Sequence, residues 1–131
     1  MINRFKVRGA WHHRGDVANT AQNAIVDFVP EPANEYDTNA IKITTRVEQE
    51  MGIPGDVDLH IGYVPKELTQ YVHPLLPLQG HISDLQWNGQ RPMIEITFES
   101  DTLIPTQQSL KKRNQQGTTN GLEDISEQGE L

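Results

Sequence analysis

The turn from Asn34 to Asn39 carries the residues of this 131-residue chain whose types and spacing are best suited to chemistry. It reads NEYDTN and leads directly into an apolar strand pattern. Asn and Asp side chains bond to the backbone of their own turn, so residue types alone favour a purely structural turn. Tyr36 weakens that preference, because a tyrosine on a stiff turn offers a ring that stacks on a nucleobase and a hydroxyl that forms hydrogen bonds.

Two adjacent histidines, His12 and His13, raise the alternative of a metal site. On a strand, neighbouring side chains point to opposite faces, so this pair would chelate one ion poorly. His60, His73 and His81 are scattered along the chain and lack a metal-binding spacing such as HExxH. A stacking or surface role is therefore favoured for the pair, and no metal and no other cofactor are expected.

Composition and motifs argue against several classes of function. The net charge of −7 argues against broad coating of duplex DNA, which needs a basic face, but allows a small phosphate site. Without cysteine, the chain has no disulfide, no thiolate zinc site and no cysteine nucleophile. Neither a GxSxG nor a P-loop pattern occurs, so we do not expect an enzyme. The absence of a membrane-length apolar run and of a signal-peptide pattern predicts a cytoplasmic protein without a membrane partner.

The elements that must position these residues are mostly strands. Apolar alternation between turn residues predicts six of them, at 5–8, 24–29, 40–47, 59–64, 81–87 and 92–98. The dipeptide Asn88-Gly89 predicts a hairpin between the last two. A helix is expected from Pro65 to His73, ending before Pro74. The predicted fold class is mostly β with one or two short helices, arranged as a small, partly closed antiparallel barrel.

A sharp change of composition near residue 104 sets the expected domain boundary. Up to residue 103 apolar runs recur at short intervals, whereas residues 104–131 are rich in Gln, Asn, Ser, Thr and Gly. Such a segment buries too little apolar surface to offset the entropy lost on ordering. We therefore expect one domain at 1–103 and a disordered polar C-terminal tail at 104–131.

Three blocks of the sequence together resemble a known family. Residues 34–43 read NEYDTNAIKI, residues 61–68 read IGYVPKEL, and residues 7–15 read VRGAWHHRG. In this order, and over residues 3–100, they resemble the HIRAN domain. The resemblance implies an OB-like barrel. It also implies capture of the 3′ end of single-stranded DNA, as in fork-remodelling ATPases, and HIRAN domains also occur as stand-alone bacterial or phage proteins.

The resemblance assigns roles to individual side chains. It implies that Tyr36 stacks on the terminal base and that Asp37 accepts a hydrogen bond from the 3′-hydroxyl. Asn34 holds the turn or touches the nucleotide, and Lys66 meets a backbone phosphate. Tyr63 falls where the family often places an aromatic residue or histidine beside that phosphate.

The chain departs from the family pattern upstream of this turn. Fork-remodelling members carry an Arg-Tyr-Tyr-like cluster where this chain has Trp11-His12-His13. Tryptophan and histidine still stack on bases, and Arg14 could supply the phosphate contact that the missing arginine makes. The second aromatic clamp of the family has three candidates near the hairpin turn: Trp87, Gln90 and Arg91.

The expected function is that of a nucleic-acid-binding module for single-stranded DNA 3′ ends, in DNA repair or replication-fork processing. RNA stays open as a ligand, because stacking and phosphate contacts are common to both nucleic acids. A partner protein would then supply any enzymatic activity. The alternative is a protein-interaction adaptor or a phage-encoded regulator that uses the same small barrel.

Overall fold

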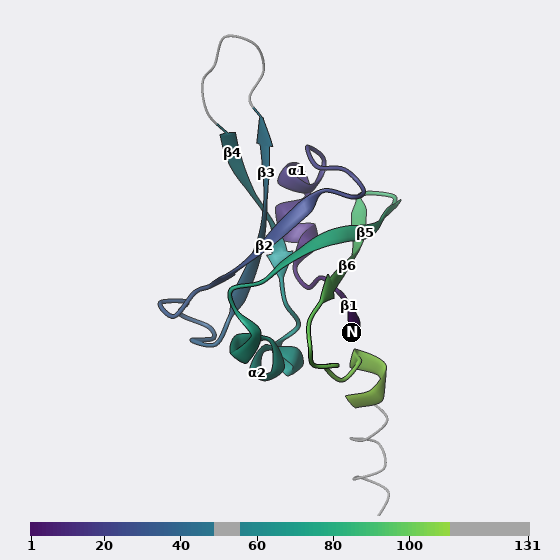
Figure 1. Ribbon diagram of the computed structural model, residues 1–131. Coiled ribbons are helices and arrows are strands. Elements are labelled where there is room, and N and C mark those ends of the chain that lie inside the picture. Colours follow the sequence, from purple (N-terminus) through teal and green to yellow (C-terminus); the bar gives the residue numbers. More distant parts are fainter. Residues whose placement is uncertain (49–55, 111–131) are drawn as a thin grey trace, which may run out of the picture.

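A computed structural model describes residues 1–48 and 56–110 of the chain (Figure 1). Its strands are β1 (Ile2–Lys6), β2 (Ile25–Pro30), β3 (Ile41–Glu48), β4 (Asp56–Tyr63), β5 (Gln79–Asn88) and β6 (Arg91–Glu99). Two short helical stretches separate them. The first contains η1 (Ala10–His13) and α1 (Arg14–Val17); the second contains η2 (Lys66–Leu68), α2 (Thr69–Val72) and η3 (His73–Leu75). The predicted fold class, mostly β with short helices, is confirmed.

All six strands belong to one antiparallel sheet with the order β1-β6-β5-β2-β3-β4. The sheet curls so that its two edges approach each other, and α1 packs against β4 (Figure 1). Where the edges meet, an isolated bridge joins Arg8, just after β1, to Tyr63 at the end of β4. Each backbone N–H donates to the other residue's carbonyl, at 2.9 and 2.8 Å. The sheet is thus a partly closed, OB-like arrangement and not a barrel with a continuous ladder.

The core fills the inside of this curled sheet. Alternating strand residues point inward, as the burial pattern of β1 illustrates, and three phenylalanines meet near the centre. The rings of Phe5, Phe28 and Phe98 lie 5.7–6.2 Å apart, in the tilted and edge-to-face geometries that aromatic pairs favour. Leu68 and Val72 of the second helical stretch are fully buried against the same core.

Gly62 permits the close approach of the two edges. Its φ of 143° belongs to a region that side chains rarely adopt. A Cβ at this position would lie 2.8 Å from the carbonyl oxygen of Arg8 and would also overlap Val7. The bridge between Arg8 and Tyr63 therefore depends on a residue without a side chain.

The predicted hairpin is confirmed, with its turn shifted by one residue. Asn88 pairs with Arg91, so the two turn residues are Gly89 and Gln90, and Gly89 has a left-handed φ of 63°. The second helical stretch runs past Pro74 instead of ending before it. It does so because Pro74 lies in the first turn of η3, where the missing N–H leaves no bond unmade.

The segment that contains His12 and His13 is helical, whereas the prediction from sequence places the pair on a strand. Gly9, with a left-handed φ of 76°, turns the chain out of the sheet and begins η1. The 3₁₀ turn brings His12 and His13 round the same short helix, so the argument from opposite faces of a strand does not apply to them. No group of three or more His, Cys, Asp or Glu side chains suited to a metal lies within residues 1–48 and 56–110.

Packed structure extends beyond the boundary expected at residue 103. Ile104 is only 5% exposed and belongs to the core, and Leu110 packs against it from a helical turn. Asn3, 2% exposed on β1, anchors residues 102–104, which we call the strap after β6. Its amide donates to the Thr102 carbonyl at 3.0 Å and accepts the Ile104 N–H at 2.8 Å. These hydrogen bonds hold the backbone beside Ile104, so this polar segment packs on the core with few apolar residues. Residues 111–131 of the predicted tail lie outside the described residues. In the described part of the chain, no helix is long and apolar enough to cross a membrane.

Candidate nucleic-acid interface

A pocket of about 410 Å³ opens beside the bridge between the two sheet edges. This volume lies within the range of small-molecule sites, about 300–1,000 Å³. Three separate segments line it, and they are the three blocks that carried the family resemblance: Arg8, Gly9, His12 and His13; Asn34, Tyr36, Asp37 and Ala40; and Tyr63, Val64 and Lys66. The fold thus brings together most of the predicted site residues, whereas Trp11 and Arg14 do not line this pocket.

The Asn34 turn is both a stiff turn and a platform for Tyr36. The side-chain oxygen of Asn34 accepts the backbone N–H of Tyr36 at 2.9 Å and that of Asp37 at 3.0 Å. The Asp37 carboxylate accepts the N–H of Asn39 at 2.9 Å. The Tyr36 side chain is nevertheless 89% exposed. The structural and the stacking interpretations of this turn are therefore compatible.

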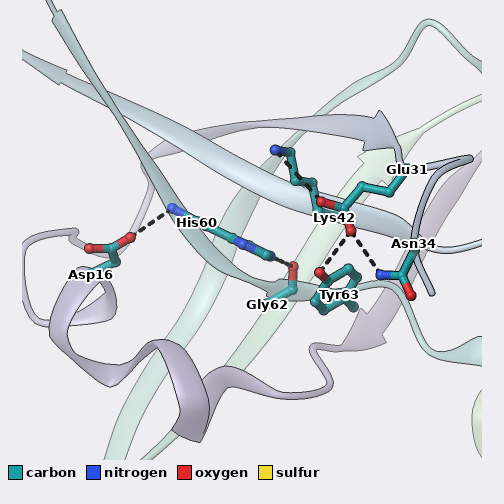
Figure 2. A network of polar contacts seen from close by, with 7 residues as sticks. All are labelled: Asp16, Glu31, Asn34, Lys42, His60, Gly62 and Tyr63. Carbon is teal, nitrogen blue, oxygen red and sulfur yellow. Dashed lines mark hydrogen bonds and ion pairs between the residues drawn. The ribbon is translucent and has the colours of Figure 1, made fainter. Parts of the chain in front are cut away.

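Glu31, a residue that the sequence did not single out, lies behind the turn (Figure 2). One oxygen of its carboxylate accepts hydrogen bonds from the Tyr63 hydroxyl at 2.8 Å and from the Asn34 amide at 3.0 Å. The Lys42 ammonium lies 3.8 Å from the other oxygen. The Tyr63 hydrogen bond keeps the pKa of Glu31 below its usual value, while burial and Glu31 raise the pKa of Tyr63 to about 12. The Tyr63 hydroxyl therefore donates its hydrogen bond to Glu31, and the Tyr63 side chain lines the pocket.

His13, which lines the pocket, stacks on His60, which lies outside its lining. The rings of His13 and His60 have centroids 3.8 Å apart, and the Tyr63 ring meets His60 edge-on at 4.9 Å. His60 Nε2 lies 3.1 Å from the Gly62 carbonyl, so this nitrogen carries the proton, and the His60 backbone N–H donates to Asp16 (Figure 2). Burial lowers the pKa of both histidines, and His13 lowers that of His60 further. Two charged imidazoles would repel each other at this distance.

Trp11 and Arg14 form a second surface with Arg91, outside the pocket. The Arg14 guanidinium lies 4.0 Å and that of Arg91 5.7 Å from the Trp11 ring centroid, both within cation–π range. Trp11 is 38% exposed, so part of its ring stays open to solvent. We call Trp11, Arg14 and Arg91 the tryptophan surface. Of the three candidates for the second clamp, Arg91 is thus the one with a cation–π contact to Trp11.

The charges around the pocket differ in how strongly they are already paired. The Arg8 guanidinium forms an exposed ion pair with Glu67 at 2.8 Å. Lys66 is exposed and forms no ion pair with any residue that the structure describes. It is thus the pocket cation most available to an anionic group.

A neighbouring hollow differs from the pocket in its charge. It has a volume of about 450 Å³, and its lining is Glu31, Pro32, Ala33, Asn34, Glu35, Tyr36 and Tyr63. Both charged residues in this lining are acidic, so the hollow is unsuited to a phosphate. Asn34, Tyr36 and Tyr63 border both spaces and therefore separate the acidic hollow from the pocket that contains Lys66.

The fold and the pocket define a class of protein: a small, partly closed β domain with a pocket beside the turn that carries Asn34, Tyr36 and Asp37. The family model of the HIRAN domain matches residues 4–99, and the chain belongs to that family. Membership makes it a nucleic-acid-binding module, of a family whose domain binds and does not itself catalyse. The searches of curated proteins and of solved structures found no significant match.

Proposed function

We propose that this domain captures the 3′ end of single-stranded DNA in the pocket between its two sheet edges. The observation that carries the proposal is the exposed Tyr36 ring on a turn whose backbone Asn34 holds through two hydrogen bonds. A ring presented on a rigid turn loses little entropy when a base stacks on it, and base–aromatic stacking contributes about 1–3 kcal/mol per base. His12 and His13 line the facing wall of the pocket and flank the stacked base.

Asp37 and Lys66 supply the polar contacts to the terminal nucleotide. One oxygen of Asp37 accepts the Asn39 N–H, and the other has no hydrogen-bond partner within the described residues. That second oxygen accepts the hydrogen bond from the 3′-hydroxyl. Lys66, exposed and without an ion pair in the described part of the chain, neutralises the preceding phosphate.

The tryptophan surface receives the strand as it leaves the pocket. Trp11 offers a partly exposed ring to the next base, and Arg14 and Arg91 offer guanidinium groups to the backbone. With few phosphate contacts, this mode of binding suits a chain with a net charge of −7. The same features favour a nucleic acid over the alternative, a peptide or protein partner. A role at replication forks or in repair, beside a partner protein that supplies catalysis, is consistent with end capture.

Fluorescence anisotropy at low salt tests the proposal with labelled single strands that carry a free or a phosphate-blocked 3′ end. We expect the free end to bind more tightly, because a blocked end places a phosphate against Asp37. Tyr36→Ala should abolish binding while the thermal unfolding midpoint stays unchanged. Ile25→Ala, which removes an exposed apolar side chain away from the pocket, is the matched control.

Three outcomes would change the assignment. Equal binding of free and blocked ends contradicts end capture and leaves a general single-strand binder. No binding to any single strand contradicts the nucleic-acid ligand and favours the protein-interaction alternative. Matched RNA strands decide whether the terminal sugar is discriminated.

A further inference from the structure

We propose that Glu31 is the positioning residue of this pocket, because its carboxylate fixes the orientation of Asn34 and Tyr63, which line the pocket from two different segments. This inference rests on the proposed function for its effect on affinity. Its effect on the geometry of the pocket is measurable without any ligand. Glu31 itself lies outside the lining of the pocket that contains Lys66 and so acts through its neighbours.

The first step is the shared acceptor. A single oxygen of Glu31 accepts from the Tyr63 hydroxyl at 2.8 Å and from the Asn34 amide nitrogen at 3.0 Å (Figure 2). Tyr63 comes from the end of β4, and Asn34 from the turn after β2. One carboxylate therefore joins two walls of the pocket that are far apart in the sequence.

The second step is the orientation of the Asn34 side chain. An amide has one end that donates and one that accepts, and a carboxylate can only accept. Because Glu31 takes the NH₂ end, the oxygen of Asn34 must face the other way, toward the N–H groups of Tyr36 and Asp37. Without Glu31, only the two backbone N–H groups hold the Asn34 amide in this orientation, so the acceptor that holds the turn is fixed less firmly.

The third step is the anchoring of Glu31 itself. Its backbone N–H donates to the Ala40 carbonyl at 2.9 Å, directly after the pairing of Pro30 with Ile41 in the sheet. The Lys42 ammonium lies 3.8 Å from the carboxylate oxygen that is not shared by Asn34 and Tyr63. The carboxylate is thus fixed to the end of the β2–β3 ladder, and it transmits the rigidity of the sheet to the turn.

The sign of the effect separates positioning from simple charge. Removing a negative charge near a phosphate site strengthens the binding of an anion if charge alone matters. Positioning predicts the opposite result at Glu31. Glu35 is the matched control, because it lies in the same turn and carries the same charge, yet it forms no hydrogen bond or ion pair within the described residues. We therefore expect Glu31→Ala to weaken binding and Glu35→Ala to leave it unchanged or tighter.

The experiment combines binding with amide hydrogen exchange, both on the full chain. For a single strand with a free 3′ end, we expect Glu31→Ala to lower affinity about tenfold, as the loss of hydrogen bonds to a charged group would. In the same variant, the amides of Tyr36 and Asp37 should exchange about tenfold faster, and Glu35→Ala should change neither rate. Glu31→Gln keeps one acceptor oxygen, so its affinity and its exchange rates should lie between those of the wild type and Glu31→Ala. This variant also tests the inference if Glu31→Ala does not fold.

A separate readout follows the contact with Tyr63. Burial and Glu31 raise the pKa of Tyr63 to about 12, and tyrosinate absorbance can follow that titration. Glu31→Gln should lower it, because a neutral neighbour no longer opposes the phenolate. Equal exchange rates and equal affinities in the Glu31 and Glu35 variants would overturn the inference. Wild-type protein that binds no single strand, while Glu31→Ala still accelerates exchange, would contradict the proposed function and support the positioning role.

Discussion

The imidazole rings of His13 and His60 stack with their centroids 3.8 Å apart and an interplanar angle of 32°. One ring comes from the turn after Gly9, and the other comes from β4. Burial lowers the pKa of both, and each ring carries a further lowering from a neighbouring histidine, His12 in one case and His13 in the other. The stack therefore belongs to the neutral form of the pair, with His60 Nε2 protonated toward Gly62.

This stack predicts that stability declines with acid. Each histidine has a lower pKa in the folded chain than the usual 6.5, so the unfolded chain takes up protons first as the pH falls. The free energy of unfolding should therefore decrease as the pH drops through 6.5, and level off below the pKa of the folded state. Urea denaturation between pH 8 and pH 5 measures this. In His60→Gln the decline should be smaller, and an equal decline in both proteins would refute the linkage.

Lys66 should account for part of the salt dependence of binding. Each phosphate contact on a single strand contributes about 0.7 to the slope of log K against log salt, so a site with two contacts gives about −1.4. Lys66→Ala should weaken binding and reduce the magnitude of the slope by about 0.7. Arg4→Ala removes an exposed cation of β1 outside the pocket and is the control. If both variants change the slope equally, the effect comes from net charge and not from a contact.

Asn3 should be a main contributor to the stability of the strap after β6. Its replacement by alanine leaves the buried Ile104 N–H without its acceptor, while the exposed Thr102 carbonyl keeps the hydrogen bond from the Ser100 hydroxyl. We expect Asn3→Ala to cost about 1–3 kcal/mol in free energy of unfolding, the cost of one unsatisfied buried polar group. Asn19→Ala removes one exposed side-chain bond to Gly15 and should cost less than about 0.5 kcal/mol. Equal costs measured by urea denaturation would contradict the anchoring role.

Gly62 and Gly15 offer a matched pair of glycine substitutions. Gly62→Ala adds a Cβ that meets the Arg8 carbonyl at a φ of 143°, so we expect a loss of about 3 kcal/mol. Gly15→Ala adds a Cβ with nothing within 4 Å, in a helix, and should stabilise the chain by up to about 1 kcal/mol. Thermal unfolding gives both values. A tolerated alanine at Gly62 would mean that the two sheet edges can separate without cost.

The sequence predicted those parts of the fold that local patterns determine. Apolar alternation located five strands closely, and Asn88-Gly89 located the hairpin, because each signal lies within a few residues. The first strand was expected at 5–8 but lies at Ile2–Lys6. The helical stretch after Gly9 was not predicted, because the five residues that follow Gly9 show no helical periodicity. The left-handed conformation of Gly9 alone starts this helix. Ile104 escaped because one isoleucine in a polar segment shows no periodicity.

The candidate site was only partly predictable for the same reason. The Asn34 turn shows its chemistry in consecutive residues, and the family resemblance linked it to the segments around His12 and Lys66. Glu31 was missed because its partner Tyr63 lies 32 residues away, on a strand that reaches it only after the sheet has curled. The one local signal was that Glu31 lies three residues before Asn34. Many acidic residues lie near Asx turns without accepting a hydrogen bond from the turn, so this spacing did not single out Glu31.

The pairing of Ile2 with Glu99 has a consequence for how the domain acquires its binding ability. The first strand finds its only described ladder partner in the last, so the sheet is completed by a contact of high sequence separation, which folds slowly. A growing polypeptide would have made all three walls of the pocket by residue 66, yet β1, which leads into the first wall, gains its ladder partner only when β6 has emerged. We therefore expect ligand recognition to mature only after Glu99 has been added to the growing chain.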